Sequence, residues 1–84
     1  MHPAITIRHS TIQDQFELAR LAALDDRPPL GREALLGFVD GELKAAVALA
    51  GDEAIADPFE RTAELVELLR LRAEQWPAEE RWAA

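Results

Sequence analysis

Alternating apolar and polar positions mark the first ordered segment of the chain. Ile5 and Ile7 alternate with Thr6 and Arg8 in the segment Ala4–Arg8. Alternation with a period of two is typical of a half-buried β-strand. We therefore expect a strand over residues 4–8.

A wide apolar stripe predicts a helix directly after this strand. Thr11 is a suitable N-cap, and Asp14 three positions later forms a weak version of a capping box. One side of the helix carries the apolar residues Ile12, Phe16, Ala19 and Ala23. The apolar surface extends around the helix through Leu18, Leu21 and Ala22. Two prolines and a glycine within Asp25–Arg32 then end the helix.

The strongest local signal is a β-hairpin centred on Asp40-Gly41. An Asp-Gly pair between two β-compatible runs is typical of a two-residue turn. The first run, Leu35–Val39, is apolar on both faces, which indicates a central strand. In the second run we assign to one face Leu43, Ala45, Val47 and Leu49, and to the other Lys44, Ala46, Ala48 and Ala50. A third short antiparallel strand is expected over Glu53–Ala56.

The segment from Asp57 to Trp76 predicts a second helix. Asp57 is a candidate N-cap with Pro58 at the first helical position and Glu60 completing an Asp-x-x-Glu box, while Thr62 is a competing N-cap. At roughly 100° per residue, one continuous stripe contains Thr62, Leu65, Val66, Leu69, Ala73 and Trp76. We expect this stripe to cover the sheet.

The order of these elements, β-α-β-β-β-α, predicts an α+β fold. We expect an antiparallel sheet of three to four strands with helices packed on it. A chain of 84 residues corresponds to one domain. We assign residues 1–76 to that domain and residues 77–84 to a short C-terminal tail.

The composition indicates which cellular compartment and which classes of binding partner to expect. The chain has no cysteine, so it forms no disulfide and no thiolate metal site, which fits a reducing compartment. The net charge is −7, with a single lysine, so nucleic acid and anionic membranes are not expected partners. No apolar stretch approaches the ~20 residues needed to span a bilayer, and the first residues lack the features of a signal peptide. We expect an acidic cytoplasmic protein.

Three short motifs in a fixed order carry a family resemblance. A leading Ile-Thr-Ile-Arg strand, a Thr-x-x-Asp helix start and a Val-Asp-Gly-Glu-Leu hairpin follow one another at residues 5–8, 11–14 and 39–43. Together they resemble the N-terminal part of the GNAT (N-acetyltransferase) superfamily. Residues 56–69 take the place of the end of the fourth strand and of the helix that binds acyl-CoA in those enzymes. The resemblance covers nearly the whole chain and implies a GNAT-like half fold.

The chain departs from the family where the cofactor is held. In the family this loop reads Arg or Gln, then x-x-Gly-x-Gly or Ala, and backbone amides at the helix start hold the CoA pyrophosphate. Arg61 matches the first position, but Glu64 and Val66 stand at the glycine positions. A carboxylate and a branched side chain both oppose a pyrophosphate there. Family members also continue into further strands. We therefore expect a truncated domain without its acetyl-CoA loop and without a cofactor.

The remaining candidate residues indicate neither a catalytic nor a metal site. His2 and His9 are the only imidazoles, and they lack partners at the spacing of metal ligands. Ser10 follows His9 directly, but adjacency alone does not make a nucleophile and its base. We interpret His9 as exposed or locally hydrogen-bonded.

Leu68 and Leu71 form a candidate partner interface because they lie off the core stripe of the last helix. They either pack under the tail against Trp82 or form a small apolar seam for another protomer.

Three functional hypotheses follow. The first is a non-catalytic GNAT-like domain that acts through protein–protein contacts as a homodimer. The alternative is a minimal acyl-CoA-binding protein or acetyltransferase with its cleft completed across a dimer; Arg61 would contact phosphate, and Asp57 or Glu60 would act as the base. The third is a subunit of a larger complex, where the acidity of the chain suits a basic partner.

Overall fold

The computed structural model describes residues 4–30, 33–51 and 53–76. The sheet strands are β1 (Ile5–His9), β2 (Ala34–Val39), β3 (Glu42–Ala48) and β4 (Ala54–Ala56). The helices are α1 (Gln15–Leu24), preceded by the 3-10 turn η1 (Ile12–Asp14), and α2 (Ala63–Glu74). The tail over residues 77–84, and with it the proposed contact of Trp82, lies outside the described residues.

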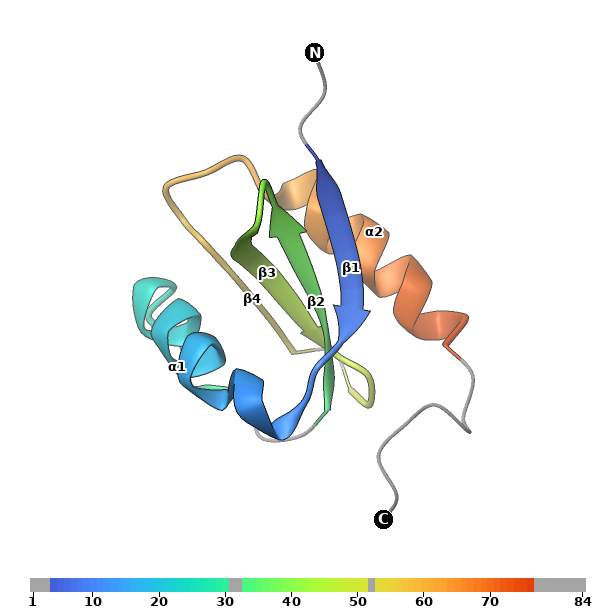
Figure 1. The fold of residues 1–84 in the computed structure, drawn as a ribbon, viewed down its shortest axis with the longest axis horizontal. Helices are drawn as coiled ribbons and strands as arrows, with labels where there is room; N and C mark the ends of the chain where they lie inside the picture. Colours follow the sequence, from blue (N-terminus) through green and yellow to red (C-terminus); the bar gives the residue numbers. More distant parts are fainter. Residues whose placement is uncertain (1–3, 31–32, 52, 77–84) are drawn as a thin grey trace.

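The four strands form one antiparallel sheet in the order in which they occur in the chain, β1-β2-β3-β4. The helices α1 and α2 pack on opposite faces of this sheet (Figure 1). The predicted α+β fold and its order of elements are confirmed. Because the sheet separates the helices, the chain has two small apolar layers rather than one core.

Each apolar layer belongs to one helix. The layer under α1 contains Leu18, Leu21, Ala22, Leu30, Ala34, Leu36, Leu43, Ala46 and Ile55. The layer under α2 contains Leu35, Ala45, Val47, Leu49, Leu65 and Leu69. The central strands β2 and β3 supply side chains to both layers, which explains why Leu35–Val39 is apolar on both faces.

The hairpin turn has the predicted two-residue form. Asp40 and Gly41 both have positive φ, at 51° and 86°, as the favoured two-residue hairpin turns require. Asp40 also holds the start of β1, because its N–H donates to the Ala4 carbonyl at 2.8 Å and its Oδ1 accepts the Ala4 N–H at 3.1 Å. The turn thus ties the edge strand to the hairpin.

A β-bulge in β3 overturns part of the predicted strand pattern. Gly37 pairs with Ala45, but Phe38 pairs with Leu43, so Lys44 is the extra residue. Because a bulge breaks the period-two alternation, Leu43 lies in the layer under α1 rather than beside Ala45. The assignment of Leu43 to the face of Ala45 was therefore wrong.

The stripe predicted for the last helix faces the sheet. Leu65 and Leu69 are buried there, with Val66, Ala73 and Trp76 partly buried around them. The helix begins after Thr62, so the cap prediction for Asp57 was wrong. Asp57 instead closes a local turn, since its Oδ1 accepts the Phe59 N–H at 2.8 Å.

Only part of the wide stripe predicted for the first helix is buried. Leu18, Leu21 and Ala22 face the sheet, whereas Ile12 and Phe16 are 80% and 79% exposed. The two sets lie on different sides of the helix, and the sheet covers only one of them. The exposed side carries Ile12, Phe16, Ala19 and Ala23.

Candidate functional site

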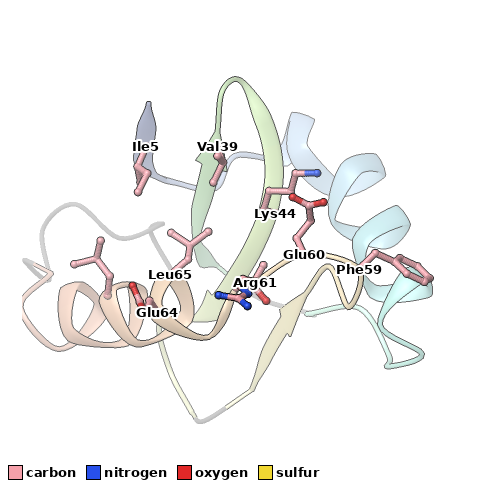
Figure 2. A pocket seen from close by; sticks show the side chains of 10 residues that line it. Ile5, Val39, Lys44, Phe59, Glu60, Arg61, Glu64 and Leu65 are labelled. Atoms are coloured by element: carbon pink, nitrogen blue, oxygen red, sulfur yellow. The ribbon is translucent and has the colours of Figure 1, made fainter. Parts of the chain in front are cut away.

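An open hollow lies between β1 and the first half of α2 (Figure 2). Its volume is about 630 Å³. Its apolar lining comes from Ile5, Val39, Leu65, Leu68 and Phe59, and its polar lining from Lys44, Glu60, Arg61, Thr62 and Glu64. We refer to it as the β1–α2 hollow.

The apolar wall of this hollow joins the edge of the sheet to the helix. Ile5 pairs with Val39 across the β1–β2 ladder, and α2 brings Leu65 and Leu68 to the same space. Leu65 lies directly over Gly37, where an added β-carbon would stand 3.0 Å from Leu65 Cδ1. Gly37 therefore allows α2 to approach the sheet closely enough to form this wall.

Lys44 stands at the polar end of the hollow because the bulge in β3 turns it away from the α1 layer. Its Nζ lies 3.2 Å from Glu42 Oε2 and 3.6 Å from Asp57 Oδ2. The hydrogen bond to Glu42 is the main cause of a raised pKa for Lys44, and the nearby charges of Glu60 and Asp57 act in the same direction. Figure 2 shows Glu60 beside Lys44. The lysine is thus a neutralised cation rather than a vacant anion-binding group.

Arg61 lies exposed just before the N-cap of α2, among carboxylates. It lines the β1–α2 hollow and also a second hollow on the side of Asp25 and Ala56. Glu60 and Glu64 line both of these spaces with it. Glu64 lines both hollows, whereas Val66, two residues later, packs into the layer under α2.

The structure places the two predicted interface residues on one exposed flank of α2. Leu68 is 37% exposed and Leu71 is 52% exposed. Leu68 lines the β1–α2 hollow together with Ile5, which is itself 50% exposed. Leu71 lies one helical turn further along, outside the lining of the hollow. We refer to the exposed side chains of Ile5, Leu68 and Leu71 as the β1–α2 surface.

No protein-family model, curated protein or solved structure matches this chain. Any functional inference therefore rests on the geometry of the β1–α2 surface and on the chemistry of the residues around it. Within residues 4–30, 33–51 and 53–76, no cluster of three or more His, Asp or Glu side chains could hold a metal ion. No helix in the same ranges is long and apolar enough to cross a membrane.

His9 is the last residue of β1, and its ring is hydrogen-bonded locally. Its Nδ1–H donates to the Ser10 carbonyl at 2.7 Å, and its Nε2 lies 3.0 Å from Glu33 Oε2. The ring also lies near that of Trp76, with centroids 6.0 Å apart. The interpretation of His9 as locally hydrogen-bonded is confirmed. Ser10 is buried and its Oγ accepts the Ala34 N–H at 2.9 Å.

Sequence reasoning did not single out several apolar residues that the structure exposes, among them Ile5, Ile12, Phe16 and Phe59. Ile5 follows the same alternation as a buried strand residue, and only its place at the sheet edge exposes it. Phe59 is 79% exposed in the turn before α2. Phe16 lies on the uncovered side of α1. An Asp-Pro-Phe turn before a helix is the signal that could have identified Phe59, because a turn of that kind lies at the surface.

Proposed function

We propose that this chain is a non-catalytic domain that acts through protein–protein contacts and forms a homodimer. The observation that carries the proposal is the β1–α2 surface, where Ile5, Leu68 and Leu71 are exposed beside an apolar hollow. Exposed apolar side chains that adjoin a hollow are typical of contact surfaces, whereas single scattered ones are not.

The edge of the sheet supports the same proposal. Among the described residues, β1 pairs only with β2. An edge strand presents unpaired backbone groups, and proteins commonly cover such edges. A second copy seated on the β1–α2 surface would shield both the edge strand and the leucines of α2 from water.

We further propose a GNAT-like scaffold that has lost its cofactor site. The order β1, α1, three antiparallel strands and α2 supports the resemblance in its general form. Glu60 and Glu64 beside Arg61 support the loss, because a pyrophosphate would meet two carboxylates at the start of α2. The exposure of Arg61 at that helix start is the observation that favours the alternative, an acyl-CoA-binding protein.

Light scattering on purified protein at micromolar concentration tests the homodimer. We expect the mass of two chains for the unaltered protein and of one chain for L68E and L71E. The variant F16E is the control, because it places the same charge on an exposed apolar residue of α1, on the opposite face of the sheet. An unaltered protein with the mass of one chain would exclude the homodimer. In that case, co-purification from native lysate tests whether the chain instead belongs to a larger complex with a basic partner.

A further inference from the structure

The charges on the exposed flank of α2 have opposite signs at its two ends. Glu64 lies four residues before Leu68, and Arg72 lies four residues after it. At about 100° per residue, residues spaced by four stay near one line along a helix, so the three side chains follow one another on this flank. Glu64 and Arg72 are both exposed. Among the described residues, neither side chain has an ion pair or hydrogen bond.

We propose that a second copy of this chain docks by pairing α2 antiparallel with α2, with the two-fold axis at Leu68. This inference rests on the proposed homodimer and names its contact. The axis at Leu68 places Glu64 of each chain opposite Arg72 of the other, which gives one ion pair on each side of a Leu68–Leu68 contact. A parallel pairing about a two-fold axis would instead bring Glu64 against Glu64 and Arg72 against Arg72.

The same register gives Leu71 a role that differs from that of Leu68. At about 100° per residue, Leu65 and Leu71 lie on opposite sides of Leu68 around the helix, and Leu65 is the one that packs toward the sheet. Leu71 of each chain therefore flanks the Leu68–Leu68 contact on the side away from the sheets, whereas Leu68, which lines the β1–α2 hollow, meets the same residue of the other chain at its mouth. Contact of a patch with its own copy is what a two-fold interface requires.

A charge-reversal experiment tests this register. In E64R both interface positions of a chain are arginine, and in R72E both are glutamate, so each variant repels a second copy of itself. We expect each to dissociate at a concentration about tenfold higher or more than the unaltered protein. An equimolar mixture of the two restores both ion pairs, and so does the double variant E64R/R72E. Light scattering measures the mass in every case, and circular dichroism verifies the fold.

The outcomes separate this inference from the proposed function. Two weakened variants whose mixture returns to the mass of a dimer support the antiparallel register. A dimer that neither single variant weakens, or a mixture that stays monomeric, overturns the register and leaves the homodimer in place. An unaltered protein that is monomeric removes both. Because ion pairs are screened by salt, the recovery in the mixture is expected to shrink between low and high ionic strength.

Discussion

Arg8 and Asp14 form a two-pronged ion pair that fastens the end of β1 to the start of the first helix. Arg8 Nη1 donates to Asp14 Oδ2 and Nη2 to Oδ1, each at 2.8 Å. The same carboxylate accepts the Thr11 N–H at 2.7 Å, which is the capping contact that the sequence predicts. One buried carboxylate thus joins a strand, a helix start and a cation. Arg8 in turn lies 4.9 Å from the centroid of the Phe38 ring.

This arrangement predicts a loss of stability in acid. The hydrogen bond from Arg8 is the main cause that lowers the pKa of Asp14 to about 2, against ~3.9 for an unfolded aspartate. A lowered folded-state pKa stabilises the fold above the unfolded pKa, and that contribution is lost as pH falls from about 4 to about 2. Urea unfolding at a series of pH values measures it. We expect R8Q to flatten this part of the profile.

Arg20 provides the control for the acid profile. Its pair with Glu17 joins two exposed side chains of one helix, and such pairs contribute little to stability. We expect R20Q to keep the steep acid dependence. An R8Q profile as steep as that of the unaltered protein would show that Arg8 does not hold the Asp14 carboxylate.

We expect the packing of α2 on the sheet to require glycine at position 37. A β-carbon there would lie 3.0 to 3.1 Å from three atoms of Leu65. We expect G37A to destabilise the fold by about 1–3 kcal/mol, the usual cost of overpacking, and G37V by more. In the double variant G37A/L65A the two costs should be clearly less than additive, because the shorter side chain removes the clash. Additive costs would contradict the close contact.

The two sides of α1 predict opposite responses to truncation. Leu18 is fully buried, so L18A should cost about 2–5 kcal/mol. Phe16 is largely exposed, so F16S should change stability by no more than about 0.5 kcal/mol. Thermal and chemical unfolding of both variants provide the comparison. A large loss from F16S would mean that the outer side of the helix is covered in solution.

Acetyl-CoA is expected not to bind. The start of α2 presents Glu60 and Glu64 around Arg61, and their charges oppose an incoming pyrophosphate. Isothermal titration of acetyl-CoA up to millimolar concentration should give no saturable heat. Saturable binding that R61A abolishes would favour the acyl-CoA-binding alternative over the non-catalytic domain.

The sequence correctly predicted the elements whose apolar pattern allows only one side to be buried or whose turn has only one position. The Asp40-Gly41 turn, the strand around Ile55 and the sheet-facing stripe of α2 each have a single apolar side or a single turn signal, and all three are present. In α1 the pattern has two apolar sides, Leu18 with Leu21 and Ile12 with Phe16. Periodicity cannot choose between them, because the choice depends on which side the sheet covers.

Two features of the structure explain where the sequence placed side chains wrongly or did not place them. An inserted residue in β3 reverses the face of Leu43, and a bulge of this kind carries no sequence signal as clear as an Asp-Gly turn. The β1–α2 hollow joins Ile5, near the start of the chain, to Leu68 on the last helix. Residues so far apart in the chain come together only through the strand order. The sequence therefore identified Leu68 and Leu71 as interface candidates but did not identify Ile5.

The sheet order has a consequence for how the chain assembles. The β2–β3 hairpin closes through two residues, whereas β1 reaches β2 only after the chain has looped through α1, with Ile5 facing Val39. Closing the longer loop costs more entropy, so we expect the hairpin to form first and β1 to join it later. Stopped-flow measurements should then show that G41V, strained at the positive φ of the turn, slows folding, whereas I7A on β1 mainly speeds unfolding. The edge strand, with Ile5 and its side of the β1–α2 hollow, would be the last part of the sheet to become native and the first to be lost.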